Sequence, residues 1–336
     1  MRDGRTCRRL PRSRLPVAAA MLVGLGPATG PAQADDGFDL TLPPDLSAAA
    51  VTADATPAAS LDSSGIADYV ATWEDRVARA RATQPGWASP LVTTTGLLEQ
   101  RVRFDAAALQ SGNGTSTAAL DGGKGLDMIV TDSNEIRFAL PPYNIRTGAP
   151  AAIANGQPIP PLSGFGDWTF LRIEQRLASS PASAGDYILS AWLQVLAPSG
   201  IGRLSGGAWT WLPTFAYGKG WGDFDIQGTL GVALPASRAG MLGHPVQNNV
   251  ALQYRIRPQL WPEVEANWTH FPDGQRAGLD QVYVTTGVVA GRFALGDRLG
   301  VTVGVGYQIA LSPPYRPIPL TPAYDHAWLF TTRMSF

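Results

Sequence analysis

Cysteine is almost missing from this chain of 336 residues, because Cys7 is the single one. Histidine is also scarce, with three residues. Cys7 lies in an N-terminal segment with the features of a signal peptide, so we expect the mature chain to contain no cysteine. A chain without cysteine forms no disulfide, binds no metal through thiolates and carries no lipid on an N-terminal cysteine.

Long hydrophobic runs and an excess of positive charge are absent as well. No stretch approaches the roughly 18 consecutive apolar residues of a membrane-spanning helix, which excludes helical spanning. Of the 26 Lys and Arg and the 27 Asp and Glu, six Arg and one Asp lie within residues 1–34, which leaves 20 basic and 26 acidic residues and a net charge near −6. A chain of net negative charge is a poor partner for nucleic acid, and none is expected.

Residues 1–34 have the three parts of a secretory signal peptide. Six arginines lie within residues 2–14, Leu15–Leu25 is a short apolar run, and Ala32–Ala34 has the small residues of a cleavage site. The pair Arg8-Arg9 is also typical of twin-arginine signals, but the residues after it fit ordinary unfolded export better. We therefore expect residues 1–34 to be removed on export.

The last residues of the chain alternate between apolar and polar side chains. One face holds Phe336, Met334, Thr332, Phe330 and Trp328, and the other holds Ser335, Arg333 and Thr331. A closed barrel in a bilayer needs such a strand to pair with the first one, because lipid offers no water to an open edge. A terminal Phe also resembles the signal by which bacterial barrel-assembly machinery recognises its substrates. This machinery is thus an expected partner, through the strand that ends at Phe336.

The same period of two runs from Pro90 to the end of the chain. In residues 299–311, for example, Leu, Val, Tyr and Ile alternate with Gly, Thr and Gln. A soluble sandwich has the same alternation, but the signal peptide, the terminal Phe and the number of strands favour a barrel with apolar side chains toward lipid. The predicted fold class is all-β, a closed antiparallel transmembrane β-barrel of about twelve strands over residues 90–336, with ten strands as the alternative.

Strand boundaries predict how the connections are arranged. The expected strands are 90–106, 124–131, 135–141, 165–178, 186–197, 207–218, 222–235, 247–257, 262–271, 280–293, 297–311 and 324–336. An even number of strands places both termini in the periplasm. Short connections are then expected on the periplasmic side at 131–134, 219–221, 258–261 and 294–296, and long extracellular ones at 142–164, 236–246 and 312–323.

One hairpin allows a residue-level prediction of register. If the turn between Pro258 and Pro262 is centred on Leu260, Arg257 faces Glu263 and Arg255 faces Glu265. Opposite charges then pair on one face and apolar residues on the other, as cross-strand energetics prefer.

Residues 35–89 differ from the rest. The stretch 35–64 is rich in Ala, Pro, Asp, Ser and Thr and is typical of a flexible linker. Apolar residues at spacings of three and four then predict an amphipathic helix over 66–83. This segment is either a plug on or inside the barrel or a loosely docked periplasmic arm. Docking at the periplasmic mouth is favoured, because a lone helix of this length is marginal in water.

Three short motifs resemble one family of outer-membrane barrels. They are Gly164-Phe165-Gly166-Asp167 with the strand Leu171–Leu177, the stretch Thr131–Ile136, and the strand end Leu196–Gly200. Over residues 90–336 the chain is similar in these motifs to the phenol meta-pathway degradation family. The resemblance implies an outer-membrane barrel that passes small, often aromatic, compounds. It implies no residue-level binding site.

The charged residues on the predicted inner face are the candidate site. The expected lumen-lining residues are Glu99, Arg101, Arg103, Arg137, Arg172, Glu174, Arg176, Asp225, Arg255, Arg257, Glu263 and Glu265. Such an interior is either a water-filled constriction or a salt-bridged, plugged core, and a barrel of about twelve strands lies between these two regimes.

Catalytic signals are weak. His244, His270 and His326 all fall near the expected extracellular rim, where Asp325-His326 is the sole adjacent acid–base pair. Neighbours in a strand point to opposite faces, so Asp325 cannot readily orient His326. We expect no enzyme activity, no cofactor and no metal site.

The sequence therefore predicts an outer-membrane barrel of a Gram-negative bacterium, with its N-terminal segment in the periplasm. The favoured function is a porin-like channel for diffusion of small, hydrophobic or aromatic solutes, with lumen charges setting selectivity. The alternative is a non-transporting structural or surface-binding barrel. The expected partners are outer-membrane lipid, the assembly machinery and a small-molecule solute.

Overall fold

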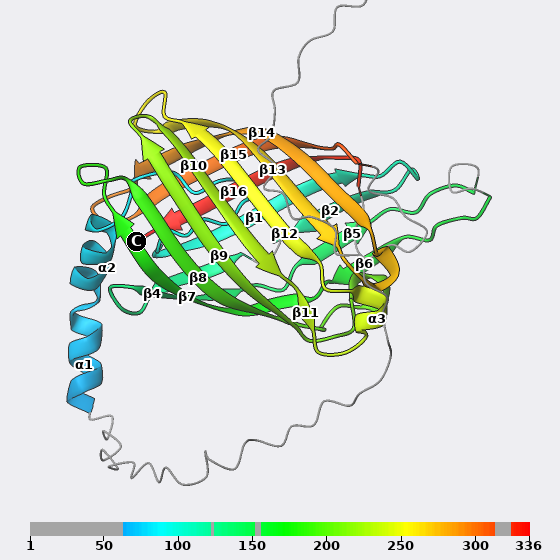
Figure 1. The fold of residues 1–336 in the computed structure, drawn as a ribbon, viewed down its shortest axis with the longest axis horizontal. Coiled ribbons are helices and arrows are strands. Elements are labelled where there is room, and N and C mark those ends of the chain that lie inside the picture. Colours follow the sequence, from blue (N-terminus) through cyan, green and yellow to red (C-terminus); the bar gives the residue numbers. More distant parts are fainter. Residues whose placement is uncertain (1–62, 122–123, 152–155, 313–323) are drawn as a thin grey trace, which may run out of the picture. The chain divides into compact units, whose positions relative to one another are not determined.

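A computed structural model describes residues 63–121, 124–151, 156–312 and 324–336, so the predicted signal peptide and most of the linker lie outside the described residues. Residues 61–336 form one compact unit. Its strands form a closed antiparallel β-barrel of 12 strands (Figure 1). The predicted fold class and strand number are confirmed.

The elements follow one another around the barrel. The helices are α1 (Ser63–Ala71), α2 (Trp73–Ala82) and α3 (Ala239–Leu242), with 3-10 turns at Gly202–Leu204 and Gly274–Arg276. The strand segments are β1 (Arg101–Gln110), β2 (Ser116–Leu120), β3 (Gly125–Ile129), β4 (Asn134–Ala139), β5 (Tyr143–Arg146), β6 (Leu162–Phe165), β7 (Trp168–Ser180), β8 (Tyr187–Ala197), β9 (Thr210–Trp221), β10 (Phe224–Val232), β11 (Leu234–Pro235), β12 (Val246–Tyr254), β13 (Leu260–Phe271), β14 (Leu279–Ala294), β15 (Gly300–Ala310) and β16 (His326–Ser335).

The barrel closes where the sequence predicts it. Strand β16 pairs with β1 in antiparallel register, from Arg101 opposite Ser335 to Gln110 opposite His326. On its other side β16 pairs with β15. The last strand therefore has a partner on both edges, as a barrel wall in lipid requires.

Several strand segments combine into longer wall strands. Strand β1 pairs first with β2, with Ala106 opposite Leu120, and then with β3, with Val102 opposite Leu126. Asp121, at the break between β2 and β3, has a left-handed φ of 58°, the kind of local kink that marks a bulge. The second wall strand thus begins at Ser116 and not at 124 as predicted.

The first strand begins later than predicted. The prediction placed it at 90–106, whereas β1 starts at Arg101. Leu97 and Leu98 are neighbours in sequence, yet each is only 1% exposed. A wall strand exposes every second side chain to the outside. Residues 90–100 are instead mostly buried, with no alternation of buried and exposed side chains, and lie inside the barrel.

The predicted register of the β12–β13 hairpin is wrong. Gln253 lies opposite Glu263, and Ala251 lies opposite Glu265. Arg255 instead pairs with Asp223, with 2.7 Å between Nη2 and Oδ1. The backbone reverses through a tighter turn than predicted, closed by a bridge between Arg257 and Leu260. The residues predicted for the inner and outer faces of these two strands nevertheless lie on those faces, because the register differs from the predicted one by an even number of residues.

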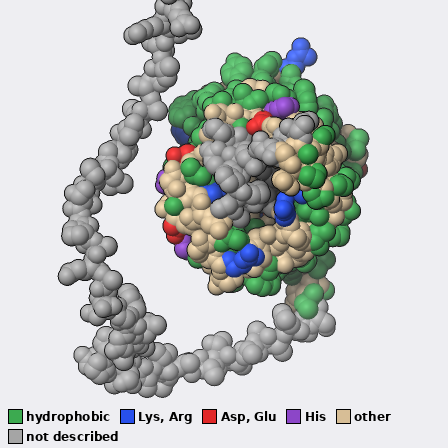
Figure 2. Space-filling view, turned by 90° about the vertical axis from the view of Figure 1, so that its right-hand side faces the viewer, with side chains coloured by type: hydrophobic (Ala, Val, Ile, Leu, Met, Phe, Trp, Pro, Cys, Tyr) green, Lys and Arg blue, Asp and Glu red, His purple; other side chains and the backbone are tan. Residues whose placement is uncertain are grey.

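The two faces of the barrel differ in polarity. Val102, Phe104 and Met334 are exposed on the outside, whereas their neighbours Arg103 and Arg333 are buried inside. Hydrophobic side chains cover much of the flank of the barrel (Figure 2). This is the pattern of a barrel whose outer face contacts lipid and whose lumen is polar.

The connections sort to two ends of the barrel. The end that carries α1, α2 and the C-terminus, here called the turn end, has short connections such as 222–223 and 255–259 (Figure 1). The opposite end, here called the loop end, has the longer connections 198–209 and 233–245. The predicted long connection 236–246 is observed as 233–245, whereas the one predicted at 312–323 lies mostly outside the described residues. The loop end also has one short connection, 111–115.

The predicted helix over 66–83 is a pair of helices that meet at Thr72. The Oγ1 of Thr72 donates to the backbone oxygen of Asp68 at 2.8 Å, which competes with regular helix geometry. Within the described residues, no helix is long and apolar enough to cross a membrane.

Candidate functional site: an inner segment and its wall contacts

Residues 84–100, here called the inner segment, lead from the end of α2 to the start of β1 through the interior of the barrel. The segment has no regular secondary structure. Gln84 folds it at the turn end, because its side-chain amide donates to the backbone oxygen of Leu98 at 2.9 Å and accepts from the Leu98 N–H at 3.0 Å. The sequence predicts a plug only for residues 35–89 as one of two alternatives, and a wall strand from residue 90 onward; residues 90–100 instead belong to the inner segment.

Wall carboxylates bind the backbone amides of the inner segment. The Leu91 N–H donates to Glu263 Oε1 at 2.9 Å. The Val92 and Thr93 N–H groups donate to the two carboxylate oxygens of Glu265 at 2.7 and 2.5 Å. Carboxylates that accept from backbone amides form strong, charge-assisted hydrogen bonds.

Wall guanidinium groups bind the backbone oxygens of the same stretch. Arg103 Nη2 donates to the Leu91 oxygen at 2.5 Å. Arg333 Nη2 donates to the Pro90 oxygen at 2.7 Å, and its Nη1 donates to the Ser89 oxygen. Carboxylates of β13 thus accept from N–H groups of the inner segment, and guanidinium groups of β1 and β16 donate to its carbonyl oxygens. These hydrogen bonds offset the cost of burying the backbone groups.

Glycines in the wall make room for two large side chains of the inner segment. A Cβ atom added at Gly287 or Gly304 would lie 2.3 or 2.7 Å from a methyl carbon of Leu91. A Cβ atom added at Gly218 would lie 2.6 Å from the Trp87 ring. Contacts this short are not tolerated, so the wall is shaped to hold these two side chains.

A ladder of buried ion pairs fills the wall beside the inner segment. It consists of Arg101, Asp127, Arg137, Glu135, Arg172 and Glu174. Arg101 Nε lies 2.9 Å from Asp127 Oδ2, and Arg172 Nη2 lies 2.5 Å from Glu135 Oε1. The ladder reaches the inner segment where Glu135 Oε2 accepts from the Glu99 N–H at 2.6 Å. Buried charges of this kind are stable only while each keeps its partner.

The residues expected to line the lumen are found in four environments. Those buried on the inner wall are Arg101, Arg103, Arg137, Arg172, Glu174, Asp225, Glu263 and Glu265. Glu99 belongs to the inner segment. Arg176 is half-buried at the turn end, where its Nη1 donates to the Ala80 oxygen of α2 at 2.8 Å. Arg255 and Arg257 are exposed beyond the end of β12 and do not line the lumen, contrary to the prediction.

Sequence reasoning missed the uncharged partners of the inner segment. Gln227 Nε2 donates to the Ala88 oxygen at 2.8 Å, and its Oε1 accepts from Thr95 Oγ1 at 2.7 Å. Ser190 Oγ donates to the Gly96 oxygen at 2.7 Å. The one available signal was their position on the polar face of alternating strands, which does not distinguish a water-lined wall from a wall that binds a peptide.

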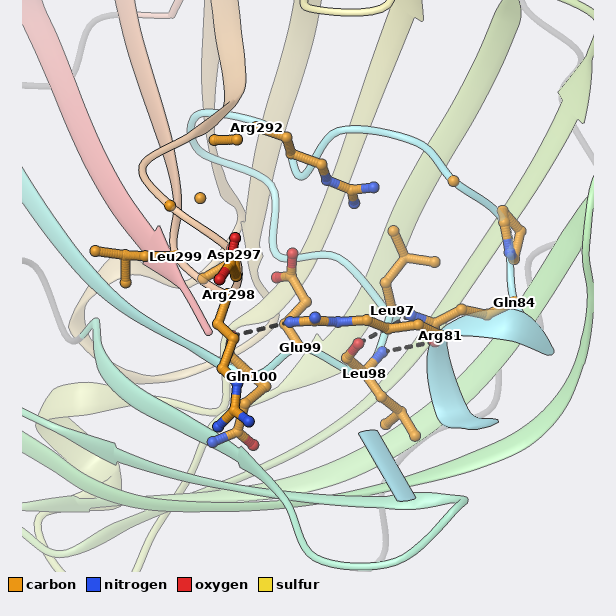
Figure 3. A pocket seen from close by; sticks show the side chains of 16 residues that line it. Arg81, Gln84, Leu97, Leu98, Glu99, Gln100, Arg292, Asp297, Arg298 and Leu299 are labelled. Carbon is orange, nitrogen blue, oxygen red and sulfur yellow. Dashed lines mark hydrogen bonds between the residues drawn. The ribbon is translucent and has the colours of Figure 1, made fainter. Parts of the chain in front are cut away.

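Cavities remain on both sides of the inner segment. One of about 290 Å³ lies at the turn end, with Arg81, Glu99 and Arg292 around it (Figure 3). Another of about 300 Å³ lies against Leu91 and Val92, farther into the barrel. A third of about 430 Å³ lies at the loop end. The strand side chains alone therefore do not fill the barrel.

Two of the histidines, His244 and His270, form hydrogen bonds to acidic residues of other loops or strands. His244 donates its N–H to Asp273 Oδ1 at 2.6 Å, and its ring Nδ1 lies 2.6 Å from Asp273 Oδ2. These hydrogen bonds lower the pKa of the exposed Asp273 carboxyl and connect two loops at the loop end. His270 Nδ1 lies 3.0 Å from Asp280 Oδ1 in the adjacent strand. In the part of the chain that the structure describes, no cluster of His, Asp and Glu could hold a metal ion.

No known family model matches the chain, and no curated protein sequence matches it. Among solved structures, the chain is similar to the NanC porin, at 7% identity over 69% of this chain and 98% of that one, with a TM-score of 0.41. It is similar to the KdgM porin, at 6% identity over 70% and 99%, with a TM-score of 0.38. A third neighbour is OmpT, an outer membrane protein of Vibrio cholerae, at 12% identity over 70% and 95%, with a TM-score of 0.31.

Likenesses this distant carry no argument about function, which has to come from the residues of the chain itself. Those residues form a closed antiparallel barrel of 12 strands around an inner segment, and the solved structures to which it is similar are outer-membrane porins and barrels.

Proposed function

We propose that this protein is an outer-membrane channel for small organic solutes, closed by its own inner segment. The observation that carries the proposal is that residues 84–100 lie largely buried in the barrel, hydrogen-bonded to its inner wall from β13 to β16. Because a continuous apolar outer face needs lipid around it, we place the barrel in the outer membrane with the turn end and the N-terminal segment in the periplasm.

The way in which the inner segment is held supports a removable block. Many of its contacts with the wall are hydrogen bonds to backbone groups, as between Glu265 and Val92 and between Arg333 and Pro90. Water can replace each of these bonds when the segment leaves, so their net strength is modest. A barrel built only as a structural element could fill its interior with wall side chains.

The solute class rests on the sequence. The resemblance to the phenol meta-pathway degradation family implies small, often aromatic, compounds. Apolar side chains beside the inner cavity, such as Leu91 and Leu329, are compatible with that class.

Single-channel conductance in planar bilayers tests the proposal. We expect the mature chain to be closed or to open rarely, and a variant without residues 35–98 to conduct steadily. Circular dichroism verifies that the variant keeps its strands. If the folded variant conducts no more than the complete chain, the protein is a non-transporting barrel and the proposal fails.

Acid is expected to loosen the inner segment through Glu99. Burial raises the pKa of this carboxyl, but the Arg101 guanidinium and the Ser89 hydroxyl outweigh it, so the pKa lies below its usual range. A lowered pKa in the docked state favours docking above the ordinary value of about 4.3, and this contribution is lost as the pH falls through the docked-state pKa.

Conductance recorded between pH 7 and pH 3 measures this effect. The complete chain is expected to open more often below about pH 4. Glu99→Gln is expected to open more often at pH 7 and to respond less to acid. Identical pH profiles for the two proteins would show that Glu99 does not hold the segment.

A further inference from the structure

The cavity at the loop end lies inside the barrel mouth. Its volume is about 430 Å³. The strand residues that line it come from the inner face of neighbouring strands, among them Leu196, Thr210, Gln247, Thr269 and Gln281. Residues of the 198–209, 233–245 and 272–278 connections complete it. On β13, Thr269 of this cavity lies nearer the loop end than Glu265, which holds the inner segment.

The charged residues of this cavity are mostly arginines. Arg203, Arg238 and Arg276 line it, together with a single acid, Asp167. The carboxylate of Asp167 accepts from the Gly200 N–H at 3.2 Å and the Gly206 N–H at 2.7 Å. Arg203 and Arg238 by themselves outnumber this carboxylate, so the cavity has an excess of positive charge in a chain of net negative charge, and such a site concentrates anions.

Two of the arginines are held in place by the surrounding loops. Arg238 has a left-handed φ of 59°, which is costly for a residue with a side chain. Its Nη1 donates to the Gly206 oxygen at 3.0 Å. Arg276 is 5% exposed, and its Cζ lies 5.0 Å from the centroid of the Phe271 ring. Groups fixed in this way lose little entropy when they bind a ligand.

One wall of the same cavity is apolar. It is formed by Leu196, Ala233, Pro235, Met241, Leu242 and Phe271. A ligand that matches both features has a negative group for the guanidinium groups and an apolar body for this wall. Seen from the loop end, several separate Lys and Arg patches lie on the end face of the barrel (Figure 2).

We propose that the loop-end cavity binds small organic carboxylates with an apolar or aromatic body. A carboxylate accepts hydrogen bonds from arginine in a planar, bidentate geometry. The ring or chain of the ligand packs against Phe271 and its apolar neighbours. The role of this site rests on the proposed function. If the barrel is a channel, the cavity selects the solute before the inner segment opens.

Calorimetric titration of the complete mature chain in detergent tests the site. The probes are benzoate, benzyl alcohol, which has the ring without the charge, and acetate, which has the charge without the ring. We expect benzoate to bind at least about tenfold more tightly than either. Equal binding of benzoate and benzyl alcohol, or of benzoate and acetate, would overturn the proposal, as would a failure of benzoate to bind.

Substitutions of exposed arginines test whether the loop-end cavity is where benzoate binds. Arg203→Gln and Arg238→Gln are each expected to weaken benzoate binding about tenfold, whereas Arg257→Gln, an exposed arginine at the turn end, leaves it unchanged. Unchanged affinity in both loop-end variants would contradict the site. Binding does not require the lumen to open, so benzoate binding without conductance would refute the channel and leave this site standing.

Discussion

Replacing Glu265 with alanine is expected to release the inner segment and open the lumen. The Glu265 carboxylate accepts from the buried N–H groups of Val92 and Thr93. Each N–H left without an acceptor costs about 1–3 kcal/mol, so the docked state loses about 2–6 kcal/mol relative to a hydrated, undocked segment. The ratio of open to closed barrels should then rise by more than about tenfold. Single-channel recordings measure this as longer and more frequent openings.

Asp225→Ala is the matched control for this substitution. Asp225 is also a buried wall carboxylate, but it accepts from Gln227 and so touches the inner segment only indirectly, through the hydrogen bonds of Gln227 to Ala88 and Thr95. Removing it perturbs the interior of the barrel without leaving an amide of the inner segment unpaired. Equal opening in the two variants would mean that any loss of interior charge loosens the barrel, and that Glu265 has no special part in closing it.

A disulfide between residues 96 and 190 is expected to lock the barrel closed. A Cβ atom built on Gly96 lies 3.3 Å from the Ser190 Cβ, close to the range of about 3.5–4.5 Å that a disulfide needs. The pair joins the inner segment to β8. Since the mature chain is expected to lack cysteine, Gly96→Cys with Ser190→Cys introduces the sole thiols.

The lock is best measured together with Glu265→Ala. Under oxidising conditions the triple variant, with both cysteines and Glu265→Ala, should stop conducting. A reducing agent should restore the openings seen with Glu265→Ala alone. Either cysteine alone should give no redox response, which excludes an effect of the substitutions themselves. Persistent conductance through a fully oxidised triple variant would show that solute passes without movement of the inner segment, and would refute the gate.

The faces of the wall strands could be predicted from the sequence, because side chains in a strand alternate strictly. Arg103, Arg137 and Glu263 were expected inside and are buried there. The closure of β1 on β16 followed from the same reasoning, since an apolar last strand in lipid cannot remain unpaired.

The register of β12 against β13 could not be predicted from the sequence. The predicted and the observed pairings of β12 with β13 place the same residues on the same faces, so both satisfy the hydrophobic pattern. The geometry of the 255–259 turn decides between them, and it brings Arg255 to Asp223 and not to Glu265. Cross-strand charge pairing is worth too little to override that geometry.

The sequence by itself determined the barrel and its polar interior, because these depend on a local period of two, and it favoured twelve strands over ten. Only the tertiary structure decided that residues 84–100 lie inside the barrel. Leu98 and Glu99 continue the alternation of β1 backward for only one step each, and so short a pattern does not reveal whether a segment pairs with neighbouring strands or is surrounded by them. That depends on groups far away in the chain, such as Glu265, Arg333 and Gly304, which together provide the donors, acceptors and space that the inner segment needs.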